Sequence, residues 1–184
     1  MAEIFPKAGL LRRGYDRETV DQFFAQARAA YEGGIPAEQF SASQVRQASF
    51  ELRRGGYDTR SVDSALNRLE AAFTQRDKVD YISVNGEANW YAKVAESATT
   101  LYPRLLRPDG ARFSHPPRGE KGYRTDEVDA LMHRITLFFD QNQPLTVGDV
   151  RLALFHSAKG EKAYREDQVD AYLGRVVEII LAAS

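Results

Sequence analysis

Histidines, arginine pairs and a repeated tyrosine–aspartate pattern are the residues of this chain that could do chemistry. The three histidines have no spacing that would let them share a metal ion, and Asp129 with His133 is an ordinary i, i+4 pair on a helix. The absence of cysteine excludes a thiolate nucleophile and a Cys-based zinc site. No nucleophile-elbow or phosphate-loop motif occurs. The sequence therefore predicts no catalytic, metal or cofactor site, and a protein that is not an enzyme.

Two arginine pairs, Arg12–Arg13 and Arg53–Arg54, lie just before the first two copies of the repeated pattern. Guanidinium groups there could bind phosphates of lipid or nucleic acid, or satisfy the carboxylates at the starts of the following helices. The formal net charge of −1 favours the second interpretation and gives no sign of a nucleic-acid partner.

A tyrosine stands five residues before a Val-Asp pair at four places in the chain. The tyrosines are 42, 66 and 41 residues apart, so the copies form two pairs with extra sequence between them. Such a period indicates a repeated supersecondary unit. We expect a first repeat pair at 1–73, an insert at 74–111 and a second repeat pair at 112–184. The motif residues with an expected structural role are Tyr15, Val20, Asp21, Tyr57, Val62, Asp63, Tyr123, Val128, Asp129, Tyr164, Val169 and Asp170.

Apolar residues follow each tyrosine at the i, i+4, i+7, i+11 spacing of an amphipathic helix. The tyrosine and valine then occupy the two positions of a hydrophobic staple at the helix start. Capping-box spacing at 41–44 and 146–149 predicts a short helix before the second and fourth copies. The sequence thus predicts an all-α fold with four short motif helices of about four turns, parallel within each pair, two lead-in helices and one longer insert helix.

The aspartate of the Val-Asp pair has no partner within its own helix that all four copies share. A shared role must therefore be tertiary, and we expect this carboxylate to accept hydrogen bonds from the loop before the tyrosine. The basic residues of those loops are Arg12, Arg13, Arg53, Arg54, Lys121 and Lys162. The glycine that precedes three of the tyrosines is expected to let the chain turn sharply into the helix.

The stretches "RRGYDRETVDQFF" and "LTVGDVRLALF…EKAYREDQVDAYL" resemble the N-terminal domain of the DivIVA cell-division and polar-growth proteins. Four copies in one short chain are similar to the small DivIVA-domain repeat proteins of actinobacteria. The resemblance implies parallel pairing of helices and a loop that contacts membrane through a Phe-Arg pair. The phenylalanine of that pair is replaced here by Arg12, Arg54 (or Arg53), Glu120 and Glu161, and each apolar seam is expected to stop after about four turns, without a long coiled coil.

The resemblance implies a non-catalytic interaction module, an adaptor for cell-division or pole-associated machinery that binds protein partners. The alternative is a peripheral membrane protein that uses its basic loops on anionic lipid. Homo-oligomers remain open, and nucleic acid is not expected. Without a signal-peptide pattern or a long apolar run, the protein is expected to be soluble and cytoplasmic, with membrane association as an option. Residues expected to contact a membrane or partner are Leu10, Leu11, Arg12, Arg13, Arg53, Arg54 and Trp90.

Overall fold

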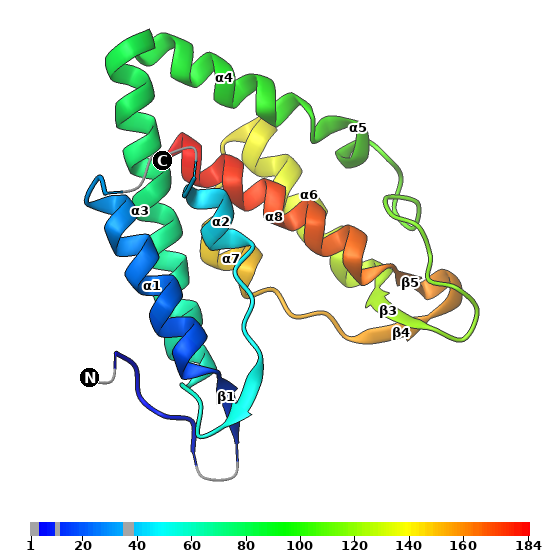
Figure 1. Cartoon of the computed structure of the whole chain (residues 1–184). Helices are drawn as coiled ribbons and strands as arrows, with labels where there is room; N and C mark the ends of the chain where they lie inside the picture. Colours follow the sequence, from blue (N-terminus) through cyan, green and yellow to red (C-terminus); the bar gives the residue numbers. More distant parts are fainter. Residues whose placement is uncertain (1–3, 10–11, 35–38) are drawn as a thin grey trace. The chain divides into compact units, whose positions relative to one another are not determined.

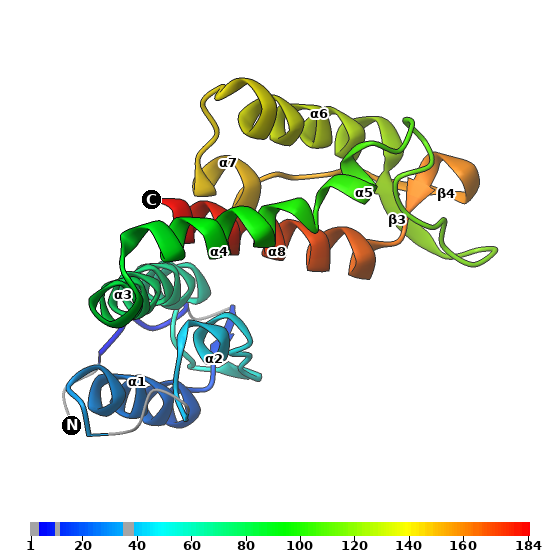
Figure 2. The same ribbon diagram turned by 90° about the horizontal axis from the view of Figure 1, so that it is seen from above.

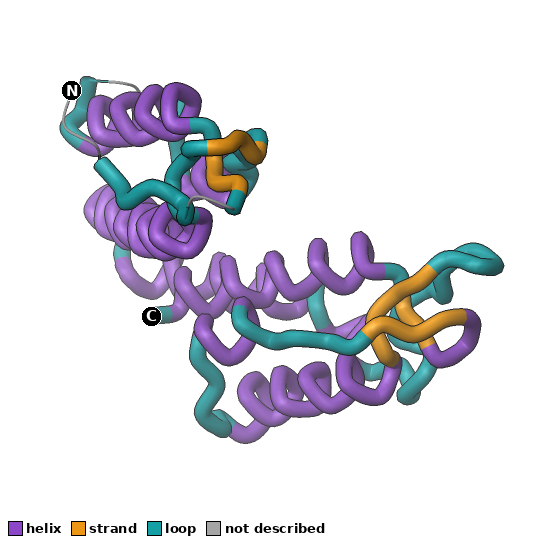
Figure 3. The backbone as a smooth tube through the Cα atoms, turned by 90° about the horizontal axis from the view of Figure 1, so that it is seen from below, coloured by secondary structure: helices purple, strands orange, loops and turns teal. Residues whose placement is uncertain are grey.

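The computed structural model describes residues 4–9, 12–34 and 39–184, and these residues are mostly helical. The chain forms two compact units, Met1–Asp80 and Tyr81–Ser184 (Figure 1). Each unit also contains a small antiparallel sheet, so the all-α prediction is correct for most of the chain and wrong for these short strands (Figure 3).

The first unit is built around two long helices and one strand pair. Its elements are β1 (Arg13–Tyr15), α1 (Arg17–Tyr31), α2 (Ala42–Arg46), β2 (Leu52–Arg54) and the start of α3 (Thr59–Asn85). β1 and β2 pair antiparallel, with Arg13 opposite Arg54 and Tyr15 opposite Leu52.

The second unit repeats this order after two further helices. The helices that come first are α4 (Glu87–Thr99) and α5 (Tyr102–Leu105). The repeated part is β3 (Lys121–Arg124), α6 (Thr125–Gln141), α7 (Val147–Arg151), β4 (Ser157–Lys159), η1 (Gly160–Lys162), β5 (Ala163–Tyr164) and α8 (Glu166–Ala183). β3 is the central strand of the sheet and pairs with both β4 and β5.

The motif helices of each pair run parallel, as the sequence predicted. In the first unit Val20 and Val62, near the two helix starts, share a buried cluster. Near the other end, the Arg76 Nη1 atom donates to the Ala30 carbonyl oxygen at 2.8 Å. Figure 1 shows α1 and α3 both leaving the β1 end of the unit, and Figure 2 shows the same common direction for α6 and α8.

Both lead-in helices carry the predicted capping boxes. Ser41 and Gln44 exchange side-chain and backbone hydrogen bonds at the start of α2, and Thr146 and Asp149 do the same for α7. The hydrogen bonds from Thr146 hold the pKa of Asp149 well below its usual value. The short aspartate is therefore an adequate substitute for glutamate at this position.

The predicted insert is not a separate element of the fold. Instead of ending after about four turns, α3 is 27 residues long and runs from the second motif copy into the insert. The prediction of a single insert helix is wrong. The helical structure is interrupted at Gly86, whose φ is 85°, and again before Tyr102 and Pro103. The division between the compact units, after Asp80, lies inside the predicted insert.

Candidate functional site

The two tyrosines of the first unit bond to each other's aspartates. The Tyr57 hydroxyl donates to Asp21 Oδ2 at 3.2 Å, and the Tyr15 hydroxyl donates to Asp63. The backbones of the two tyrosines are also paired, at 3.0 Å from Tyr15 N to Tyr57 O and 2.8 Å in the reverse direction. Each copy of the motif therefore completes the other copy.

The second unit has the same reciprocal arrangement. Tyr164 donates to the carboxylate of Asp129 at 3.1 Å, and Tyr123 donates to Asp170 at 3.4 Å. Tyr123 and Tyr164 are opposite one another in the β3–β5 pair. Burial raises the pKa of Tyr164 to about 12, so the hydroxyl remains a donor at physiological pH. We call each of these arrangements a tyrosine–aspartate crossing.

These crossings correct the predicted partners of the motif aspartates. The role is tertiary, as predicted, but the donor that all four copies share is the tyrosine of the other copy, and not one of the six basic residues that were predicted. Asp129 receives additional bonds from Arg112 Nη1 at 2.7 Å and from the Gly110 backbone N–H at 2.8 Å, and neither residue was predicted. The available signal was that tyrosine and aspartate occur together in all four copies.

The motif valines and tyrosines form the apolar part of the crossings. Tyr57 packs with both Val20 and Val62, so its ring serves two helices rather than only the helix that it precedes. The phenylalanines that open the first and third copies complete the packing. Phe5 meets Tyr57 at a ring-centroid distance of 5.5 Å, and Phe113 meets Tyr164 at 5.3 Å.

The glycine before the tyrosine is required by close backbone contact, not by a turn. A Cβ at Gly14 would lie 2.1 Å from the Tyr57 carbonyl oxygen, and a Cβ at Gly122 would lie 2.0 Å from that of Tyr164. Neither glycine has a positive φ. The crossing therefore needs these glycines because no side chain fits between the two backbones.

Basic side chains face one another at the sheet of each unit. Arg13 is directly opposite Arg54, and Lys121 is directly opposite Lys159. All four side chains are exposed. Like charges at opposed positions destabilise a strand pair. We call the pair of opposed cations in each unit its basic tip.

The remaining members of the two arginine pairs, Arg12 and Arg53, have different surroundings. Arg53 lies opposite Gly14, and its Nε atom is 3.2 Å from Asp16 Oδ2, the carboxylate that caps α1. Hydrogen bonds from Ser61 are the main cause that lowers the pKa of Asp58, and the charges of Arg60 and then of the exposed Arg12 lower it further. Arg12 and Arg53 therefore both fit the predicted role of loop charges beside helix-start aspartates.

The remaining residues predicted to contact a membrane or partner are Leu10, Leu11 and Trp90. Leu10 and Leu11 lie outside the described residues. Trp90 is buried, and its indole Nε1 donates to the Ala182 carbonyl oxygen at 2.9 Å near the end of α8. Because both the ring and its donor are engaged within the second unit, Trp90 is not the exposed partner contact that was predicted.

An exposed apolar strip in the second unit was missed by the sequence analysis. Leu152 and Leu154 follow α7 and have exposed fractions of 76% and 92%. In the matching segment of the first unit these positions hold Gln47 and Ser49, which are also exposed. The signal was present in the alignment of 41–50 with 146–155. We refer to Leu152 and Leu154 as the leucine strip.

Nothing among the described residues assembles a metal centre, since no group of three His, Asp or Glu side chains could hold an ion. No helix in that part of the chain is both long enough and apolar enough to cross a membrane. A comparison with protein-family models, characterised proteins and solved structures finds no match.

Proposed function

We propose that this protein is a non-catalytic interaction module of the DivIVA-domain type, an adaptor for cell-division or pole-associated machinery. The crossings support this proposal, because they join two parallel motif helices at their starts, the pairing that the sequence resemblance implies. One chain supplies both helices of each pair, so each pair forms within a single chain.

The leucine strip is the observation that most directly supports binding to a protein partner. Large apolar side chains exposed in this way lose water when a partner covers them, and each buried leucine contributes about 1.5–3 kcal/mol. The first unit carries polar residues at the matching positions of the same local structure. The leucines are therefore not needed by the local structure, and we assign them to a partner protein with an apolar contact surface.

The matched test transfers the residues of the first unit to the second. The double variant Leu152→Gln, Leu154→Ser should fold with an unchanged circular-dichroism melt, because both side chains are exposed. Affinity purification from the native host, with quantitative mass spectrometry, should recover specific proteins with the wild type and lose them with the variant. The reverse variant, Gln47→Leu with Ser49→Leu, controls for non-specific binding of proteins to exposed leucines. Identical recoveries for wild type and the Leu152/Leu154 variant would refute the proposal.

A second candidate function, peripheral binding to anionic membrane, is favoured by the basic tips. Their four opposed cations have no carboxylate partner in the described part of the chain, and an anionic surface would relieve their mutual repulsion. Each basic side chain near such a surface contributes about 1 kcal/mol.

Liposome co-sedimentation separates this candidate from the first. The wild type should sediment with vesicles that contain anionic lipid more than with neutral vesicles, and the double variant Arg13→Ala, Arg54→Ala should lose this preference. Added salt should weaken the binding of the wild type. The leucine-strip variant is the control and should bind like the wild type. Equal sedimentation with neutral and anionic vesicles would remove this candidate.

A further inference from the structure

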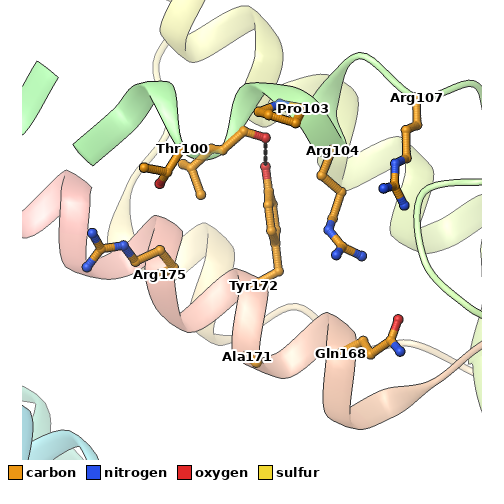
Figure 4. Close-up of a pocket in the computed structure, with 9 residues that line it drawn as sticks. Thr100, Pro103, Arg104, Arg107, Gln168, Ala171, Tyr172 and Arg175 are labelled. Atoms are coloured by element: carbon orange, nitrogen blue, oxygen red, sulfur yellow. Dashed lines mark hydrogen bonds between the residues drawn. The ribbon is translucent and has the colours of Figure 1, made fainter. Parts of the chain in front are cut away.

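A pocket of about 460 Å³ lies between α5 and α8 of the second unit (Figure 4). Three arginines line it: Arg104 and Arg107 from the α5 side and Arg175 from α8. The polar side chains around them are Thr100, Gln168 and Tyr172. This volume lies within the range of small-molecule sites.

The charge of the pocket is strongly unbalanced. None of its nine lining residues, all within the described part of the chain, is acidic. Arg175 is paired with Glu178 at 2.6 Å, whereas Arg104 and Arg107 have no carboxylate partner among the residues that the structure describes. Burial and the nearby charge of Arg107 lower the pKa of Arg104. An anion between them would remove this unfavourable electrostatic interaction.

The arginines are held in place by groups that do not neutralise them. Arg104 Nη1 donates to the Arg112 carbonyl oxygen at 3.0 Å, and Arg107 Nη1 approaches the same oxygen at 3.4 Å. The guanidinium of Arg104 also lies over the ring of Phe113, at 4.7 Å from the centroid. Donors oriented before a ligand arrives lose less entropy on binding.

Other polar groups in the wall are also fixed. The Tyr172 hydroxyl donates to the Leu101 carbonyl oxygen at 3.0 Å, which Figure 4 shows between α5 and α8. The Gln168 side-chain oxygen, which would repel an anion, accepts from the Ser114 backbone N–H at 3.0 Å. One wall of the pocket comes from α5 and the residues that follow it, which stand before the second pair of motif copies.

We propose that this pocket binds a phosphate monoester, with its phosphoryl group at Arg104 and Arg107. A monoester carries about −1.5 to −2 charge at pH 7, which matches two guanidinium groups without a carboxylate. Guanidinium groups bind phosphate oxygens through paired charge-assisted hydrogen bonds. The remaining volume accommodates the organic part of the ligand. This proposal is independent of the adaptor function.

The test is calorimetric titration of the full chain with O-phosphoserine, serine, succinate and inorganic phosphate at constant ionic strength. O-phosphoserine should bind, serine should not, and succinate should bind more weakly. Arg107→Gln should weaken O-phosphoserine binding at least about tenfold, the effect of losing one charge-assisted hydrogen bond. Arg118→Gln makes the same charge change at an exposed position outside the pocket and should leave binding unchanged.

A second variant avoids any loss of structural contacts. Ala171 is exposed and lines the pocket, so Ala171→Glu places a carboxylate there and should abolish binding while the thermal melt stays unchanged. A phosphoserine peptide distinguishes the two sources of the phosphate. Binding much tighter than that of O-phosphoserine assigns the site to a phosphorylated protein, and equal or weaker binding assigns it to a small molecule. The proposal is overturned if O-phosphoserine does not bind, if succinate binds equally well, or if Arg118→Gln weakens binding as much as Arg107→Gln.

Discussion

Asp21 in the first unit and Asp129 in the second hold the same position in their crossings, and Asp129 in addition accepts a hydrogen bond from the Arg112 side chain. The difference traces to one pair of matching residues, Ile4 and Arg112. Both donate their backbone N–H to the hydroxyl of the buried tyrosine, at 3.4 Å and 3.2 Å. The Arg112 side chain continues to Asp129, whereas Ile4 cannot, and Asp21 Oδ1 is buried without a hydrogen-bond partner.

This contrast separates what the motif fixes from what its surroundings add. The tyrosine–aspartate bond and the backbone pairing occur in both units, so the motif itself specifies them. How completely the buried carboxylate is satisfied depends on a residue ten or more positions before the tyrosine, outside the motif. A buried polar atom without a partner is unfavourable by about 1–3 kcal/mol. Each crossing has one such atom, Asp21 Oδ1 in the first and Arg112 Nε in the second, so the two crossings differ in which side of the interaction is left incomplete.

The largest effect should come from removing the buried tyrosine of either crossing. Tyr57 and Tyr164 have exposed fractions of 1% and 0%, so Tyr57→Ala or Tyr164→Ala should lower the free energy of unfolding by about 4 kcal/mol. Tyr15→Ala should lower it by about half as much, because that ring is only partly buried. Urea unfolding with hydrogen exchange read separately in the two units measures these changes. An equal effect at Tyr15 and Tyr57 would contradict the asymmetry within the first crossing.

Next in size is the change that makes the second crossing resemble the first. Arg112→Met keeps most of the apolar stem but leaves Asp129 buried without its cation, which should lower the free energy of unfolding by about 3 kcal/mol. Adding Asp129→Asn should recover part of the loss. Protection of α6 and α8 against hydrogen exchange should fall while that of α1 stays constant. A loss under about 1 kcal/mol would show that Arg112 contributes no more than an exposed ion pair.

The opposite exchange should strengthen the first crossing. Ile4→Arg offers Asp21 the guanidinium that Arg112 gives to Asp129, and should raise the free energy of unfolding by about 1 kcal/mol. Ile4→Met is the matched control, because it has a similar length without charge. If both variants behave alike in urea unfolding, the geometry at residue 4 does not reproduce that at Arg112.

The smallest expected effect concerns the bonds made by the two less buried tyrosines, Tyr15 to Asp63 and Tyr123 to Asp170, which we call the outer bonds and which are alike in the two units. Burial raises the pKa of both Asp63 and Asp170 above the usual 3.8. A raised folded pKa means that these groups favour folding below pH 3.8 and that this contribution is lost as pH rises through the folded pKa. Asp63→Asn and Asp170→Asn should therefore stabilise slightly at pH 7, by less than about 1 kcal/mol because the groups are largely exposed, and not at pH 3. Thermal melts at the two pH values test this, and a gain in only one unit would show that the outer bonds differ.

The sequence predicted the helices because their signals are local. Apolar spacing identified α1, α6 and α8, and the capping boxes marked the starts of α2 and α7. The strands were missed because each is only two to four residues long and forms through hydrogen bonds to a segment about 40 residues away. Local pattern carries little information about such pairing.

The residues of the tyrosine–aspartate crossings could be predicted from the sequence, but which residue bonds to which could not. Spacing selected the four tyrosines and four aspartates, and the search for a partner within one helix correctly excluded a local role. The exchange between copies was missed because each copy was considered alone. The roles of Arg112 and of the pocket arginines depend on the placement of α5 and the loop after it, which no repeat or period indicates.

The fusion of two motif copies in one chain has a consequence for concentration. When two separate chains supply the halves of a crossing, dilution separates them, whereas copies joined by a short connection meet at a high and fixed local concentration. Each unit of this protein should therefore keep its melting temperature on dilution. Fusion also frees the two copies to diverge, because a substitution in one is not imposed on the other. That freedom is visible in the buried Tyr57 beside the partly exposed Tyr15.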